Sequence, residues 1–147
     1  MKRKFLPSDF GFVASAILFA FSATQNGFCV QNSSNCWPGY FLVPLGWLEF
    51  VAIKDAGPFP ILAWAANPLW LMAIAAGFRR DGKSALYLSL AAVALGSTFF
   101  LAKGVAVSEA GGAPYPVTVY GPGLWLWLSS FVLAAASSLV LQGAKKG

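Results

Sequence analysis

Long uncharged apolar stretches, separated by short clusters of basic residues, constrain this chain more than any other feature. Eight of its ten Lys and Arg residues lie in three clusters, within residues 2–4, 79–83 and 145–146. An apolar helix needs about 20 residues to cross the hydrocarbon core of a bilayer, and positive charge collects at the cytoplasmic ends of such helices. The pattern therefore predicts an integral membrane protein with both ends and one middle loop on the cytoplasmic side.

Composition excludes several other classes of protein. The chain has 147 residues, of which 58% are hydrophobic and only 10% charged, too apolar for an ordinary soluble domain. Its net charge of +5 does not indicate nucleic-acid binding, because the cations lie at predicted helix ends, where they meet anionic lipid headgroups. The chain has no His, the commonest general base and metal ligand. We expect one membrane domain over residues 1–147, membrane lipid as a partner, and no nucleic acid, metal or cofactor.

Four apolar runs are candidate transmembrane helices, each flanked by charge or by Gly and Pro turn signals. They cover residues 10–23, 61–78, 85–102 and 124–141. With the first basic cluster inside, alternating helices return the other two clusters to the inside as well. The predicted fold is an all-α bundle of four transmembrane helices, with outer loops over residues 24–60 and 103–123.

A fifth apolar run, residues 40–53, is predicted to be an outer-face interfacial or re-entrant helix. If it crossed the membrane, the clusters at 79–83 and 145–146 would both move outside, against the positive-inside rule. The run is also short for a span and contains Pro44 and Glu49.

The first apolar run has a second interpretation, as a signal peptide. A basic start, an apolar stretch and small residues near Ser22 fit cleavage after that residue. Asp9 interrupts the usual run from basic region to apolar core, and the spacing of Gly11 and Ser15 suits a helix that packs against others. We favour a retained helix and leave cleavage open.

Small residues predict how the helices pack. Ala92 and Gly96 in the third helix, and Ser130, Ala134 and Ser138 in the fourth, each recur at intervals of four, which allows close backbone approach in lipid. We expect these stripes to pack within the chain rather than to form a dimer face.

The second helix contains Asn67-Pro68 in its interior. Proline removes a backbone donor and frees the carbonyl of Trp64, so a kink near Trp64 is expected. We expect the Asn67 amide to bond to backbone or to a neighbouring helix, because the membrane offers no water. A hinge or ligand-facing point is the alternative.

Two features are expected in the outer loops. Cys29 and Cys36, the only cysteines, would form a structural disulfide in an oxidising compartment, since their spacing differs from the C-x-x-C of thiol oxidoreductases. The alternating runs 105–107 and 117–120, around a Gly and Pro centre, predict a β-hairpin.

Aromatic residues favour the predicted outer side. Those at or beyond the outer interface are Trp37, Tyr40, Trp47, Tyr115, Tyr120, Trp125 and Trp127, against Tyr87 alone on the inner side. Interfacial anchoring explains some of them, and an outer binding surface is the alternative. If there is a functional surface, we expect it to be built from Trp47, Glu49, Trp64, Asn67, Tyr120, Trp125 and Trp127, with Glu49 as a polar site above a cavity or a carboxylate that simply reaches water.

Three sequence strings carry a resemblance: Gly46-Trp47-Leu48, Ala63-Trp64-Ala65-Ala66-Asn67-Pro68-Leu69 and the Tyr120–Ser130 stretch. They resemble segments of small uncharacterised bacterial four-span inner-membrane proteins, which carry AWxANP and YGxGxWLWLxS strings. The similarity runs in order from about Trp37 onward. It implies a bacterial inner (plasma) membrane location and the four-span layout, and it implies no activity; the cysteine pair is not part of it.

The leading functional hypothesis is a non-enzymatic membrane accessory or interaction protein, whose aromatic outer face contacts lipid, another membrane protein or a second copy. A small oligomeric transporter or channel is the alternative, although the spans lack the ionisable residues typical of ion paths. An enzyme would depend on Glu49, Asp55, Glu109 or the cysteine pair, and no nucleophile and base can be matched.

Overall fold

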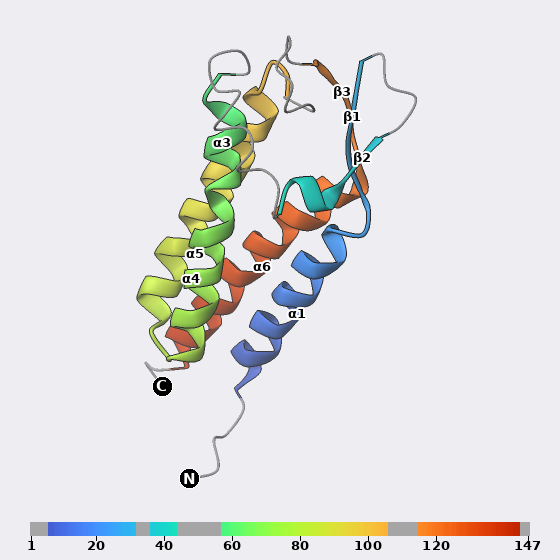
Figure 1. Ribbon diagram of the computed structural model, residues 1–147. Helices are drawn as coiled ribbons and strands as arrows, with labels where there is room; N and C mark the ends of the chain where they lie inside the picture. Colours follow the sequence, from blue (N-terminus) through green and yellow to red (C-terminus); the bar gives the residue numbers. More distant parts are fainter. Residues whose placement is uncertain (1–5, 32–35, 44–56, 106–114, 145–147) are drawn as a thin grey trace.

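The computed structural model describes residues 6–31, 36–43, 57–105 and 115–144, and this part of the chain is mostly helical (Figure 1). A three-stranded sheet caps one end of the helices. The helices are α1 (Pro7–Ser22), α3 (Phe59–Trp64), α4 (Ala66–Phe78), α5 (Gly82–Ser97) and α6 (Pro122–Gly143), with the short 3-10 helices η1 (Gly39–Phe41) and η3 (Thr98–Leu101). The strands are β1 (Asn26–Val30), β2 (Cys36–Pro38) and β3 (Val117–Tyr120).

The helices begin two or three residues before the predicted apolar runs, at residues 7, 59, 82 and 122. Pro7 and Pro122 occupy first helical positions, where proline is favoured because the missing N–H would have no partner there. α5 is capped by Asp81, whose carboxylate accepts a hydrogen bond from the Ser84 N–H at 3.1 Å. Capping chemistry, rather than hydrophobicity, therefore sets these boundaries.

Three helical segments are long and apolar enough to cross a membrane: Phe59–Phe78, Gly82–Leu101 and Pro122–Gly143. α1, with 16 residues, is a shorter apolar helix. The outward-facing large apolar side chains include Phe10, Ile17, Leu71, Met72, Leu90, Val132, Leu139 and Val140. The buried polar side chains of the described residues are seven serines, one aspartate and one asparagine: Ser8, Asp9, Ser15, Ser22, Asn67, Ser89, Ser130, Ser137 and Ser138. Apolar outside and partly polar inside is the arrangement that suits lipid.

α6 is the central helix of the bundle. α1 packs along one side of it and α5 along another, while α4 packs on α5 (Figure 1). Gly11 of α1 lies so close to Ser137 of α6 that an added Cβ would collide with the serine side chain. The predicted stripe of Ser130, Ala134 and Ser138 is wholly buried. The expectation that these small residues pack within the chain is confirmed.

A break divides the second apolar run into α3 and α4. α3 ends at Trp64, and α4 begins at Ala66. Pro68 lies two residues into α4, and its ring and missing N–H act on the carbonyl four residues earlier, at Trp64. The predicted kink near Trp64 is confirmed.

The sheet combines segments that are distant in sequence. β1 pairs with β2 on one side and with β3 on the other, so the strand order is β2-β1-β3. The predicted hairpin of residues 105–107 and 117–120 is visible only where Val105 and Tyr115 form an antiparallel bridge. Residues 106–114 lie outside the described residues, so the rest of that hairpin stays a prediction. The pairing of β3 with β1 was not predicted.

The predicted disulfide is confirmed. Cys29 and Cys36 are bonded, and they lie opposite each other on β1 and β2. The bond thus closes a short hairpin that sequence reasoning placed in an unstructured loop. The run Phe28-Cys29-Val30, bounded by Asn and Ser, was the strand signal available.

The predicted interfacial helix over residues 40–53 is only partly visible. Its first residues belong to η1, and Leu42 and Val43 follow in a turn. The remainder of the prediction, with Trp47 and Glu49, lies outside the described residues.

Candidate functional site

The predicted surface residues fall into two separate groups. Trp64, Asn67 and Trp127 form one group near the α3–α4 break, in which Asn67 and Trp127 are buried and Trp64 is partly exposed. Tyr120 of β3 and Trp125, on the outer flank of α6, form a second group around Phe100. Trp47 and Glu49 lie outside the described residues.

Asn67 is the centre of the inner group, and its side chain is only 5% exposed. Its Nδ2 donates to the backbone carbonyls of Leu42 and Val43, at 2.8 and 3.1 Å. Its Oδ1 accepts from the Trp127 Nε1 at 2.7 Å. Trp64 adds a fourth bond, from its Nε1 to the Val43 carbonyl at 2.9 Å. These four contacts are called the Asn67 node below.

The Asn67 node joins three elements that are distant in sequence. Asn67 belongs to α4, Trp127 to α6, and the two carbonyls to the turn after η1. Both amide protons of Asn67 are used, and Trp127 is fully buried. The node therefore ties the turn to the kinked helix, as expected for a structural asparagine in a medium without water.

A second buried polar cluster lies deeper in the bundle. The Trp70 Nε1 donates to the Ser15 Oγ at 2.9 Å, and the Ser15 Oγ donates to the Ser130 carbonyl at 2.7 Å. The Trp70 ring stacks on Phe19 with centroids 3.9 Å apart. Sequence reasoning missed this cluster, although Ser15 had been assigned to a helix-packing face. It links α1, α4 and α6 at mid-length.

An apolar groove of about 600 Å³ runs along α6 between α1 and α5. Trp125, which is 55% exposed, marks one end of it, and Phe100 lies beside Trp125 at a centroid distance of 5.4 Å. Tyr120 meets the same Phe100 edge to face at 5.0 Å. The groove is lined by Leu18, Val93, Ser97, Phe100, Trp125, Leu128, Ser129, Val132, Leu133 and Ala136.

The groove offers few polar contacts to a ligand. Among the described residues that line it, only Ser97 and Ser129 carry a hydroxyl, and the Ser97 Oγ already donates to the Val93 carbonyl at 2.8 Å. A groove of this size and chemistry suits an apolar chain or side chains rather than a polar metabolite.

A buried ion pair lies at the opposite end of the bundle. Both guanidinium Nη atoms of Arg80 donate to the Asp9 carboxylate, each at 2.9 Å. Asp9 is 1% exposed and Arg80 26%, and the same carboxylate accepts from the Leu6 N–H at 2.9 Å. Bidentate geometry of this kind is the strongest form of an ionic contact.

Arg80 holds its position in a strained backbone conformation. Its φ is +65°, in the left-handed region. The N–H groups of Arg80 and Asp81 donate to the carbonyls of Gly77 and Ala76, both at 2.9 Å, so Arg80 follows the C-cap of α4 in a Schellman motif. Glycine is the usual residue there. The ion pair with Asp9 offsets the strain that an arginine side chain adds.

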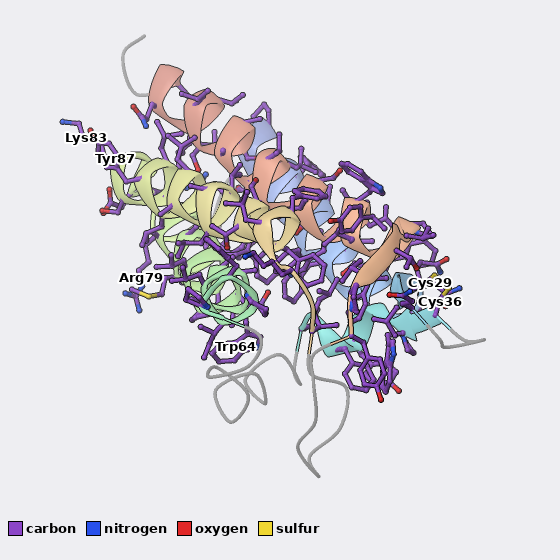
Figure 2. All side chains as sticks on the ribbon, turned by 90° about the horizontal axis from the view of Figure 1, so that it is seen from above. Cys29, Cys36, Trp64, Arg79, Lys83 and Tyr87 are labelled. Carbon is purple, nitrogen blue, oxygen red and sulfur yellow. A yellow bond between two sulfur atoms is a disulfide. The ribbon has the colours of Figure 1, made fainter. Side chains whose placement is uncertain are left out.

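The cations next to this pair face away from the bundle. Figure 2 shows Arg79, Lys83 and Tyr87 projecting outward from the α4–α5 end. Tyr87 is 72% exposed, and it follows Lys83 by one helical turn. Cations and tyrosine at a helix end are typical of a headgroup region.

No reacting pair is found among the described residues. Asp9 is bonded to Arg80 and Asp81 caps α5, and both cysteines are in the disulfide. No group of His, Cys, Asp and Glu in the described ranges could hold a metal ion. The carboxylates of Glu49, Asp55 and Glu109 lie outside them.

Comparison with known proteins adds no identification, since no family model, curated protein or solved structure matches the chain.

Proposed function

We propose that this chain is a bacterial inner-membrane protein with four spans and both termini in the cytoplasm. The contacts at the ends of the helices support one common inner end. The start of α1 meets the α4–α5 turn through Asp9 and Arg80, and the end of α6 meets the same turn through a bond from Gln142 Nε2 to the Gly82 carbonyl at 2.9 Å. Of the three basic clusters predicted to be cytoplasmic, the one at residues 79–83 lies within the described residues, and it is at this end.

α1 is the shortest of the four proposed spans. At about 1.5 Å per residue, a helix of its length reaches roughly 24 Å, less than the hydrocarbon thickness of about 30 Å. Local thinning of the bilayer accommodates such a difference at modest cost. Phe10 and Ile17, both more than 60% exposed, give α1 an apolar outer face like those of the longer helices.

Within the membrane, the protein acts as a non-enzymatic accessory or interaction protein that contacts an apolar partner along the α6 groove. The observation that carries this proposal is that the buried polar side chains bond within the protein, while the groove is apolar. The polar groups of four residues bond to one another and to backbone carbonyls: Ser15, Asn67, Trp70 and Trp127. The residues that line the groove are mostly apolar. The partner is a lipid chain or a helix of another membrane protein.

The transporter alternative gains no support from these contacts. Asn67 and Ser130 are buried and bonded within the protein, and the Thr98 Oγ1 bonds to the Leu95 carbonyl at 2.6 Å. A modest polar route through the spans would need Asn67, Ser97, Thr98, Ser129 and Ser130, and of these five only Ser97 and Ser129 line the groove. Absence of ion or solute flux in liposomes is the expected result.

Site-specific photocrosslinking in native membranes tests the groove. A photoreactive residue at Val132, in the groove and 55% exposed, should give a discrete adduct. The matched control is Leu71 on α4, which is 58% exposed and is not among the groove residues. Filling the groove with Ala136→Trp should abolish the Val132 adduct. Equal adducts from Val132 and Leu71, unaffected by that substitution, would contradict the proposal.

A further inference from the structure

The hairpin closed by Cys29 and Cys36 lies at one end of a continuous set of contacts that reaches the centre of the bundle. β2 begins at Cys36 and ends at Pro38, η1 follows directly, and Leu42 and Val43 come next. Those two residues provide the carbonyl groups of the Asn67 node. Cys36 is therefore only seven positions from Val43, whose carbonyl bonds the residues at the kink of the second helix.

β2 makes few backbone contacts. It has three residues, lies at the edge of the sheet, and among the described strands pairs with β1 alone, in a register that is irregular between Asn26 and Phe28. One further backbone bond, from the Gly39 N–H to the Gln25 carbonyl at 2.6 Å, ties the start of η1 to the residues after α1. Trp37 packs on Phe41 and against the core. The disulfide therefore adds a covalent tie to a strand that is otherwise held by a few backbone bonds and one aromatic side chain.

The carbonyls of Leu42 and Val43 can accept bonds from Asn67 only while β2, which precedes them in the chain, keeps its position. Asn67 uses both of its amide protons on Leu42 and Val43, and the Val43 carbonyl also accepts from Trp64. A displacement of the turn would leave these donors, and the amide that orients Trp127, without partners in a buried site. Unpartnered buried polar groups are costly, so the turn and the node favour each other's bonded state.

We propose that the disulfide hairpin is a redox-sensitive strut that sets the packing around the α3–α4 kink. In the oxidised state, β2 holds the Leu42 and Val43 carbonyls over Asn67, and Asn67 holds Trp127. A dithiol reductant opens the strut: it transfers two electrons and two protons, the Sγ–Sγ bond breaks to give two thiols, and the dithiol closes to its own disulfide. The released β2 then loosens the node. This inference does not depend on the proposed function.

Fluorine NMR of the full chain, labelled with 5-fluorotryptophan in lipid nanodiscs, tests the proposal. Each resonance is assigned by a single Trp→Phe variant. On reduction with dithiothreitol, or in Cys29→Ser/Cys36→Ser, the Trp64 and Trp127 resonances should shift, while Trp125, on the outer flank of α6, stays in place. Unchanged Trp64 and Trp127 signals, with both thiols shown to be free by alkylation, would overturn the proposal. A shift of all resonances together would also overturn it, because that result indicates general unfolding.

Thermodynamic coupling must be reciprocal, which gives a second and independent test. Asn67→Leu removes the bonds that favour the closed hairpin, so its equilibrium constant for reduction by dithiothreitol should rise by about fivefold. Trp64→Phe removes one of those bonds and should have a smaller effect in the same direction, which keeps the test valid if Asn67→Leu fails to fold. The matched control is Ser138→Ala, also buried but bonded to the Ala134 carbonyl of its own helix. Equal reduction constants for all three variants and the parent protein would refute the coupling.

Discussion

The two ends of the bundle are held together by opposite means. At the sheet end, many neutral contacts hold the elements together: the hydrogen bonds of a three-stranded sheet, a disulfide and the Asn67 node. At the α4–α5 end, an apolar cluster around Phe12, Ala85 and Leu141 is joined by a charged contact, the ion pair between Asp9 and Arg80. The polar contacts that join the elements are therefore many and neutral at one end, and include a charged pair at the other.

The difference follows from the path of the chain. At the sheet end, α1 continues into β1 within a few residues, and β3 leads directly into α6. At the α4–α5 end, the partners of the ion pair are 71 positions apart in sequence. The ion pair adds a strong polar contact to the apolar packing of that end, and bidentate charge pairs are strong only while both partners are present. Four substitutions test this contrast.

Removal of the Asp9 carboxylate should have the largest effect. Asp9→Ala removes the carboxylate that bonds to Arg80. That bond offsets two free-energy costs at Arg80, the partial burial of its charge and its left-handed backbone conformation. We expect a loss of about 3–5 kcal/mol in the free energy of unfolding, the range for breaking a buried pair from one side. Thermal unfolding in a fixed detergent measures it.

The matching double variant separates charge from backbone strain. Asp9→Ala/Arg80→Gly removes the unpaired cation and places glycine at φ +65°, where it is favoured. The double variant should be more stable than Asp9→Ala alone. If the double variant is less stable than Asp9→Ala, the ion pair does not determine the stability of the α4–α5 end. The contrast between the two ends would then be contradicted.

Removal of the disulfide should lower the free energy of unfolding by a smaller amount, because the sheet and the Asn67 node also stabilise the sheet end. Cys29→Ser/Cys36→Ser opens a ring whose ends are 7 positions apart, and we expect a loss of about 2–3 kcal/mol by the chain-entropy estimate. The melting temperature of the double variant, compared with that of the oxidised parent protein, measures this loss. A loss larger than that of Asp9→Ala would reverse the ranking of the two ends.

Packing near the ion pair offers a third measurement. A Cβ at Gly77 would collide with the ring of Phe12, which is fully buried. Gly77→Ala should cost about 1–2 kcal/mol, the lower part of the range for overpacking. Gly143→Ala is the control, since nothing lies within 4 Å of a Cβ at that position. Equal melting temperatures for the two variants would show that this end tolerates rearrangement.

The smallest effect on stability is expected at the outer flank of α6. Trp125 is 55% exposed and has Phe100 as its aromatic neighbour, so Trp125→Ala should change the free energy of unfolding by less than about 1 kcal/mol. The proposed function requires that the same substitution reduce the crosslink formed from Val132. A large loss of stability with an unchanged crosslink would instead assign Trp125 to packing alone.

Much of the architecture was readable from local sequence. The apolar runs predicted the helices to within a few residues, Asn67-Pro68 predicted the break after Trp64, and the two cysteines predicted their bond. These features depend on neighbours in the chain: hydrophobic period, a missing N–H, and a spacing that excludes a redox motif. The bounds shifted only where Pro and Asp capped the helices.

What the sequence by itself determined about this protein was therefore its set of membrane-length segments, its kink and its disulfide. Only the tertiary structure decided that β3 pairs with β1, that Asn67 and Trp127, 60 positions apart, share a bond, and that Asp9 meets Arg80. The candidate surface divided for the same reason: Asn67 and Trp127 are buried, while Trp125, two residues away, faces outward. Long-range pairing depends on where distant segments meet in space, and no local pattern encodes that meeting.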